Sequence, residues 1–157
     1  MDTSKGNPVE IIQLKPEDYG KCANIWDMAG RPEMAALFYR ELVSGNRLIY
    51  VYTEDGAYLG EGSLVLERDD PDYSIPGQRI YLSRLVVKKE VRGRGIGSAL
   101  LDYLCDTATT MGYSEISLGV DKANEGAFRL FRRKGFDEVL FEGEDEQGPY
   151  YKLLKKL

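Results

Sequence analysis

The sequence contains no histidine, and this absence removes two common kinds of chemistry. Histidine is the side chain that enzymes use most often as a general base, and it belongs to most of the usual zinc-binding sets. Only two cysteines occur, Cys22 and Cys105, in separate helical patterns without the spacing of a metal site. We therefore predict no metal site and two buried free thiols, as in proteins of a reducing compartment.

Long hydrophobic runs are also absent. No stretch approaches the roughly 18 apolar residues of a membrane span, and residues 1–8 lack the apolar region of a signal peptide. The net charge of −5 argues against a nucleic-acid-binding surface and mildly favours a cationic acceptor. With 157 residues, 43% of them hydrophobic and 30% charged, we expect one cytoplasmic domain over residues 1–157 that binds neither nucleic acid nor membrane.

The most informative segment is VRGRGIGSALL, residues 91–101, which follows the β-branched run 84–87 and leads into a helical pattern. A helix N-terminus presents unpaired N–H groups and the positive end of a dipole, and glycines let an anion approach the main chain. Flanking arginines add donors that suit phosphate. We predict a diphosphate-binding loop. Its residues are Arg92, Gly93, Arg94, Gly95, Ile96, Gly97 and Ser98.

The spacing of these glycines distinguishes among the known phosphate loops. No Gly-Lys-Ser or Gly-Lys-Thr of a P-loop occurs, and Ser98 and Leu100 stand where a nicotinamide-binding fingerprint needs glycine. The segment resembles instead the acetyl-CoA loop of the GNAT superfamily of N-acetyltransferases, Arg/Gln-x-x-Gly-x-Gly/Ala. Arg92, Gly95 and Gly97 occupy its fixed positions.

A second segment, residues 124–136, resembles the family pattern Asn-x-x-Ala-x-x-Leu-Tyr-x-x-x-Gly-Phe, so the close resemblance covers residues 79–136. It implies that Asn124 contacts the pantetheine arm of acetyl-CoA, although Asn124 also suits a simple helix N-cap. It places Phe131 in the cofactor site, where the family usually has a tyrosine general acid. The arm would enter between the splayed fourth and fifth strands and pair with main-chain groups of Leu85, Val86 and Val87.

The general base is harder to assign. Ser83 stands where many relatives have a catalytic glutamate. Glu61 and Glu67 on the neighbouring predicted strand share a parity and would face the same side. Tyr81 shares the parity of Ser83 and could anchor a water molecule. These four are the catalytic candidates, and because Ser83 removes the usual carboxylate we expect proton transfer through water rather than to a glutamate.

The pattern of the chain predicts an α/β fold: a mixed, mostly antiparallel central sheet of about seven strands flanked by about four helices, as in the GNAT family. A surface loop is expected at 68–78 and an acidic turn at 142–149. Strands are expected at 9–14, 48–52, 58–66, 78–87, 115–120, 136–141 and 150–154, and helices from Pro16, over 34–42, over 96–111 and from Asn124.

These observations lead to one functional hypothesis and one alternative. The hypothesis is an N-acetyltransferase that moves the acetyl group of acetyl-CoA to a primary amine of a small molecule or of a protein or peptide. The alternative is a non-catalytic acyl-CoA-binding module, because Phe131 has no proton to give and Ser83 replaces a carboxylate. The partners are acetyl-CoA and the acceptor amine, and a homodimer remains an open option.

Overall fold

The computed structural model describes residues 8–157, which divide into two compact units. Unit 1 runs to Ser63 and includes Arg84–Tyr103, and unit 2 consists of Leu64–Ser83 and Leu104–Leu157. The strands are hydrogen-bonded in the order β1-β2-β3-β4-β5-β7-β6 and form one seven-stranded sheet. The predicted fold class is therefore confirmed, and the two units are described separately below.

The first strands of unit 1 follow the sequence prediction closely. Strand β1, Val9–Gln13, pairs antiparallel with β2, Arg47–Glu54. Strand β3, Ala57–Val65, follows β2 through a two-residue turn in which Asp55 and Gly56 have φ of 53° and 82°. Positive φ at both central residues gives the turn the twist that a tight hairpin needs, and Asp-Gly is a preferred pair there.

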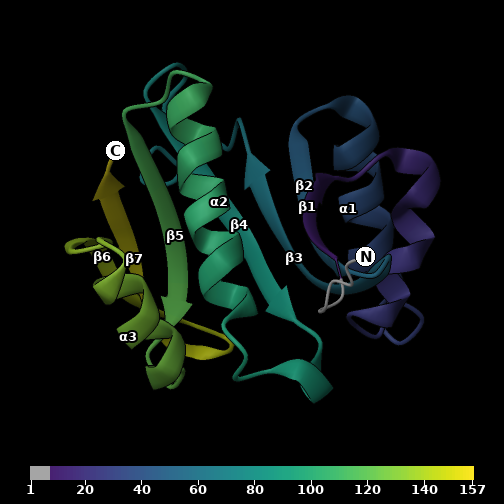
Figure 1. Ribbon diagram of the computed structural model, residues 1–157. Coiled ribbons are helices and arrows are strands. Elements are labelled where there is room, and N and C mark those ends of the chain that lie inside the picture. Colours follow the sequence, from purple (N-terminus) through teal and green to yellow (C-terminus); the bar gives the residue numbers. More distant parts are fainter. Residues whose placement is uncertain (1–7) are drawn as a thin grey trace. The chain divides into compact units, whose positions relative to one another are not determined.

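The two helical segments of unit 1 differ in type. Helix α1, Pro32–Ser44, begins at a proline and ends at Gly45, whose φ is 87°. It packs against β2 (Figure 1). The segment expected as an α-helix from Pro16 is instead the 3₁₀ helix η1, Pro16–Asn24. Its buried side chains Tyr19 and Cys22, and Ile25 just after its end, recur every third residue, which matches the 3₁₀ repeat rather than the α repeat.

Strand β4, Arg79–Val87, and helix α2, Ile96–Thr110, are joined by the short 3₁₀ helix η2, Lys89–Val91, and the glycine loop. In unit 1 the start of α2 packs closely on β3 at Gly60. A Cβ atom on Gly60 would lie 3.0 Å from Ile96 Cγ2 and 3.2 Å from the carbonyl oxygen of Val86. Glycine at this position therefore allows the close approach that brings the first turn of α2 onto the sheet.

Unit 2 is built on β5, Glu115–Asp121, which pairs parallel with β4 from Arg79↔Glu115 to Tyr81↔Ser117. On its other side β5 pairs antiparallel with β7, Gly148–Lys156, and β7 pairs antiparallel with β6, Glu138–Asp145. Helix α3, Glu125–Arg133, contacts β5 (Figure 1).

The prediction of an acidic turn at 142–149 is wrong. Strand β6 continues to Asp145 and β7 begins at Gly148, so the turn consists of residues 146–147 alone. Gly148 has φ of 114°, a conformation that favours glycine. Because β6 is an outer strand of the sheet, its acidic side chains remain in water. The acidic composition of residues 142–149 therefore led to the prediction of a turn where the strand continues.

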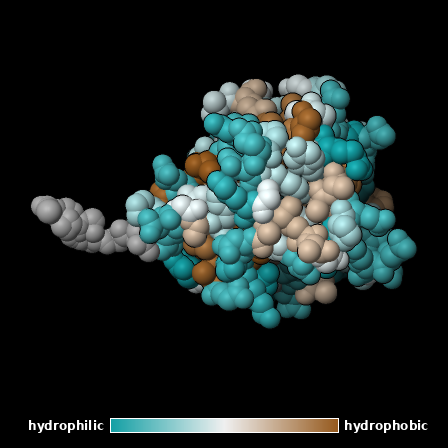
Figure 2. All heavy atoms as spheres, turned by 90° about the vertical axis from the view of Figure 1, so that its right-hand side faces the viewer, coloured by the Kyte–Doolittle hydropathy of each residue, from teal (hydrophilic) through white to brown (hydrophobic). Residues whose placement is uncertain are grey.

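The face in Figure 2 is mainly hydrophilic, with hydrophobic atoms in small separate groups. Scattered exposed apolar side chains of this kind are ordinary on a protein surface. Among residues 8–157, no helix has both the length and the hydrophobicity that crossing a bilayer would require.

Candidate active site

The glycine loop of unit 1 adopts the open conformation that an anion-binding turn requires. Gly93 and Gly95 have φ of 86° and 84°, which other residues adopt only with strain. A Cβ atom on either residue would meet no atom within 4 Å. Gly97 lies in the first turn of α2, where a Cβ atom would be 3.7 Å from the Val87 side chain. The loop thus leaves space beside its main chain.

The first turn of α2 supplies donors to this space. The amide of Ala99 donates to the carbonyl of Gly95 over 3.0 Å, which closes the first α-helical turn. The N–H groups of Ile96, Gly97 and Ser98 precede that bond, and an α-helix provides no carbonyl for its first N–H groups. Together with the helix dipole, they suit a diphosphate.

The two arginines of the loop differ in their surroundings. Arg92 Nε donates a hydrogen bond of 3.0 Å to the carbonyl oxygen of Val87, the last residue of β4. Arg94 Nη2 donates a hydrogen bond of 2.7 Å to Glu54 Oε1, and this carboxylate neutralises much of the charge of Arg94. Arg92 is therefore the better candidate to contact a diphosphate, and Arg94 ties the loop to the end of β2.

Glu61 is the buried carboxyl of unit 1. It lies on β3 with only 1% of its surface exposed, and no described residue donates a hydrogen bond to its Oε1. Its Oε2 lies 3.7 Å from Arg84 Nε. Burial raises the pKa of Glu61, and the charge of Arg84 with the polar groups of Cys22 and Trp26 offsets this only in part. A carboxyl with a raised pKa is suited to accept a proton near neutral pH.

The other three catalytic candidates lie in different surroundings. Glu67 is exposed and follows the end of β3 at Val65, so the expectation that it shares a strand face with Glu61 is wrong. Tyr81 of β4 stacks on Tyr73 in unit 2 with ring centroids 4.2 Å apart. Ser83 is half-buried on the same strand. Of the four, Glu61 alone is deeply buried, and burial raises its pKa.

In unit 2, the second sequence motif has evident structural roles. Asn124 caps α3, because its Oδ1 accepts a hydrogen bond of 3.2 Å from the amide of Ala127. Phe131 is 7% exposed, and its ring meets that of Phe136 edge-on at 5.9 Å. Gly135, with φ of 100°, follows the end of the helix, a position that favours glycine. Contact of Asn124 and Phe131 with the cofactor stays a prediction.

Sequence reasoning missed Arg84. Its guanidinium carbon lies 4.4 Å from the ring centroid of Trp26 and 5.2 Å from that of Phe38, and its Nε faces Glu61. A charged residue within the otherwise apolar run 84–87 was the available signal. Apolar strand patterns usually mark core, so an arginine there needs a partner or a function.

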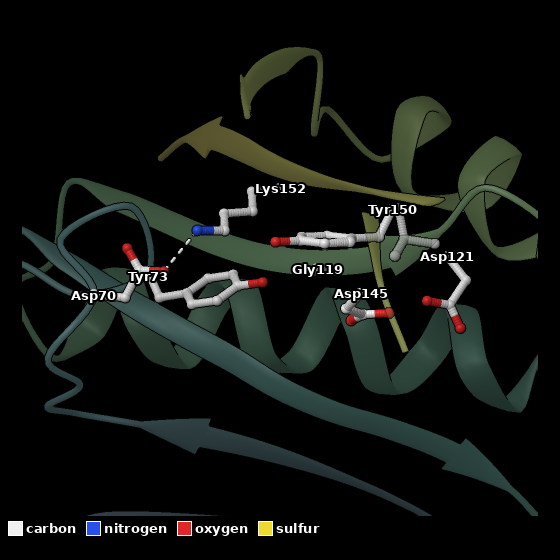
Figure 3. Close-up of a pocket in the computed structure, with 8 residues that line it drawn as sticks. Asp70, Tyr73, Gly119, Asp121, Asp145, Tyr150 and Lys152 are labelled. Carbon is white, nitrogen blue, oxygen red and sulfur yellow. Dashed lines mark hydrogen bonds and ion pairs between the residues drawn. The ribbon is translucent and has the colours of Figure 1, made fainter. Parts of the chain in front are cut away.

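A separate cavity of about 260 Å³ lies within unit 2 (Figure 3). Lys152 Nζ donates hydrogen bonds to Asp70 over 2.6 Å and to Asp72 over 3.2 Å, and it lies 5.0 Å from the ring centroid of Tyr73. An ammonium group of the chain itself thus neutralises part of this acidic surface. The lining residues are Asp70, Tyr73, Gly119, Val120, Asp121, Asp145, Tyr150 and Lys152.

No metal centre emerges from the part of the chain that the structure describes. Residues 8–157 contain no group of three or more His, Cys, Asp or Glu side chains placed to hold an ion.

Comparison with known proteins matches this sequence to acetyltransferases. A sequence model described as the Acetyltransferase (GNAT) family matches residues 25–136. The streptothricin acetyltransferase of Streptomyces lavendulae is 27% identical over 185 residues, covering 96% of this chain and 95% of that protein. The N-alpha-acetyltransferase MAK3 of Arabidopsis thaliana is 35% identical over 75 residues, covering 48% of this chain and 38% of that protein.

Solved structures share the fold. The PaiA N-acetyltransferase of Thermoplasma acidophilum, solved in complex with coenzyme A, aligns with a TM-score of 0.68 and 22% sequence identity. The alignment covers 96% of this chain and 99% of that one. At this identity the likeness shows the fold alone.

Proposed function

The chain belongs to the GNAT family of acetyltransferases, which use acetyl-CoA as the acetyl donor, and we propose that it acetylates a primary amine of a small molecule. The observation that carries the proposal is the open glycine loop at the start of α2, in the same unit as the buried carboxyl of Glu61. The loop can hold a diphosphate, and the carboxyl can receive a proton. Acetyl transfer from acetyl-CoA to an amine uses a site that holds the donor and a group that accepts the proton.

The donor would be held chiefly by main-chain groups. Gly93 and Gly95 leave room for the diphosphate, and the first-turn N–H groups of α2 follow them directly in the chain. Arg92 would add a charged donor, and Val87, to which it is hydrogen-bonded, is one of the residues that the family resemblance assigns to the pantetheine arm. The diphosphate contacts thus need no side chain other than Arg92.

We propose Glu61 as the general base, which replaces the water relay expected from the sequence. An ammonium must lose a proton before its nitrogen can attack, and the Glu61 carboxylate would take that proton. Acetyl-CoA supplies the thioester, whose C–S bond breaks as the new C–N bond forms. A thiol pKa of about 8.5 makes the thiolate a fair leaving group, so the lack of a hydroxyl on Phe131 does not prevent turnover.

The comparisons favour a small-molecule acceptor over a protein. The relative named for streptothricin matches over nearly the whole of both chains. The relative named as an N-alpha-acetyltransferase matches less than half of either chain. The full-length match therefore carries more weight in this proposal.

The test is release of free thiol from acetyl-CoA across a panel of primary amines, with mass spectrometry of each product. We expect acetylation of at least one small amine, and a greater than tenfold loss of kcat in Glu61→Gln. Glu67→Gln, an exposed carboxyl in the same stretch of chain, is the matched control and should retain activity. Tight binding of acetyl-CoA without thiol release from any amine would favour the non-catalytic module. Acetylation of peptide N-termini alone would overturn the small-molecule acceptor.

A further inference from the structure

The guanidinium of Arg84 has far more donors than acceptors around it. Its side chain is only 16% exposed, and its Nε makes no hydrogen bond to any of residues 8–157. Its Nη1 contacts the sulfur of Met34 at 3.9 Å, and sulfur is a weak acceptor. Glu61 lies 3.7 Å from Nε, beyond hydrogen-bonding distance. An arginine that is largely removed from water in this way lacks the acceptors that its five N–H groups require.

The surroundings hold this guanidinium in a fixed position. It lies 4.4 Å from the ring centroid of Trp26 and 5.2 Å from that of Phe38, so aromatic rings from two segments border it. Glu61 is on the Nε side, and the contact with Met34 involves Nη1. Four of the five N–H groups are on the terminal Nη atoms, where the sulfur of Met34 is only a weak acceptor for Nη1, so these donors can bind another group. A guanidinium fixed in this way is organised for paired hydrogen bonds to a planar anion.

Neighbouring charges strengthen the preference for an anion. Burial lowers the pKa of Arg84, and the charges of Arg47 and Arg31 lower it further, while Glu61 and Tyr19 oppose them. Arg47 is fully buried and pairs with Glu41, and its guanidinium carbon lies 4.1 Å from the ring centroid of Phe38. Two arginines thus border the Phe38 ring in a poorly hydrated region, Arg47 in a close pair with Glu41 and Arg84 farther from its nearest carboxylate, Glu61.

A cavity borders the same region. It has a volume of about 440 Å³ and lies at the start of α1, where Arg31, Glu33 and Met34 are among its lining residues. Met34 is also the residue that contacts Arg84. The N-terminal end of a 13-residue helix adds a favourable dipole for a negative group.

We propose that Arg84 binds a carboxylate on the acceptor, so that the substrate class is an amine that also carries a carboxyl group. This inference rests on the proposed function and specifies its acceptor. The terminal N–H groups of Arg84 would donate to the two carboxylate oxygens, while the buried Glu61 in the same unit receives the proton of the reacting amine. Arg84 is then a specificity-determining residue, and its aromatic neighbours set the orientation of its guanidinium.

The first experiment compares matched acceptors. Steady-state kcat/KM is measured for amino acids and for the corresponding carboxamides, each corrected to the concentration of free amine. A paired, charge-assisted contact predicts a roughly 10- to 100-fold preference of the wild-type enzyme for the carboxylate. Arg84→Gln should remove this preference, and Arg84→Lys should retain part of it. Arg40→Gln, an exposed arginine on α1, should keep the wild-type ratio.

A second measurement tests the site without turnover. Pentanoate, which has a carboxylate but no amine, should bind the wild-type protein in calorimetry, while pentanamide should not. Binding of pentanoate should be lost in Arg84→Gln and unchanged in Arg40→Gln, with each variant shown to be folded by its thermal transition.

The outcomes separate the two proposals. Equal use of acids and amides by the wild type, or an acid preference that persists in Arg84→Gln, overturns the role of Arg84 even when amines are acetylated. If no amine is acetylated, the proposed function fails, and the pentanoate titration still decides whether Arg84 binds a carboxylate.

Discussion

Arg92 is hydrogen-bonded through its Nε to the carbonyl oxygen of Val87, across the turn that joins β4 to the glycine loop. The bond of 3.0 Å holds the loop against the last residue of the strand. We expect Arg92→Gln to weaken acetyl-CoA binding by about tenfold, because one charge-assisted contact of roughly 1.5 kcal/mol is lost while the main-chain donors remain. Calorimetry with acetyl-CoA measures this, and unchanged affinity would show that Arg92 only shapes the turn.

A carboxylate inside the loop should have a larger effect. Gly95→Asp places a negative charge where the diphosphate is expected, and two like charges 4 Å apart repel by about 4 kcal/mol at an effective dielectric constant of about 20. We expect acetyl-CoA binding to fall below detection by calorimetry. Gly45→Asp is the matched control, since Gly45 also has a positive φ and open space around its Cβ position. Equal affinity in the two folded variants would contradict the loop assignment.

Phe131 should matter for stability more than for chemistry. Its ring is buried against Phe136, so Phe131→Ala should lower the free energy of unfolding by about 3–5 kcal/mol. Phe131→Tyr should leave kcat unchanged or raise it, particularly at low pH, where a phenol could protonate the departing thiolate. Urea unfolding and steady-state kinetics measure the two effects. A large loss of turnover in a folded Phe131→Tyr protein would mean that the ring shapes the substrate site.

Much of the fold follows from local patterns in the sequence. The pair Asp55-Gly56 is typical of a tight turn because few other pairs adopt positive φ at both positions, and Gly45 and Gly135 suit helix ends for the same reason. The 3₁₀ helix at Pro16–Asn24 was not predictable, because three- and four-residue spacings of apolar side chains overlap in so short a segment. The length of β6 was hidden by acidic residues, which an outer strand tolerates.

The candidate site was predicted only in part. The loop glycines could be found because their spacing reflects backbone geometry that other residues resist. The choice between Glu61 and Glu67 could not be made from strand parity, because β3 ends at Val65, between the two. Arg84 was missed because its significance depends on Trp26 and Phe38, which come from distant segments of the chain.

Glu115 should make the free energy of unfolding depend on pH in the acidic range. Burial opposes its ionisation, but hydrogen bonds from Lys156, Arg79 and Gln78 outweigh this and lower its pKa from 4.5 to about 2. A carboxyl with a lowered pKa in the folded state stabilises that state above its unfolded pKa, and the contribution is lost as pH falls toward the folded value. We therefore expect a loss of about 3 kcal/mol between roughly pH 5 and pH 2.

Urea unfolding of the wild type and Glu115→Gln across this range is the measurement. The two proteins should differ clearly at pH 7 and converge near pH 2. Glu138→Gln, an exposed carboxyl on β6, is the control and should match the wild type at every pH. A constant difference between wild type and Glu115→Gln would show that packing, not ionisation, accounts for the role of Glu115.

The pH profile of catalysis tests the general base. Burial raises the pKa of Glu61 and outweighs the opposing effect of Arg84. If Glu61 accepts the proton of the acceptor, log(kcat/KM) should rise with pH through an inflection above the ordinary range of a glutamate carboxyl. The measurement needs an acceptor amine of low pKa, so that deprotonation of the amine does not mask the enzyme group. The inflection should be absent in Glu61→Gln.

The same profile distinguishes Glu61 from a relay of water molecules. Without an enzyme base, log(kcat/KM) would climb smoothly to the pKa of the amine, because no histidine is present to titrate in between. Glu67→Gln should keep the wild-type inflection, since Glu67 is exposed and lies beyond the end of β3. Arg84→Gln should shift the inflection upward, because removing a neighbouring positive charge raises the pKa of a buried carboxyl further. A wild-type profile without inflection, or one that survives Glu61→Gln, would assign proton removal to water and leave Glu61 a structural role.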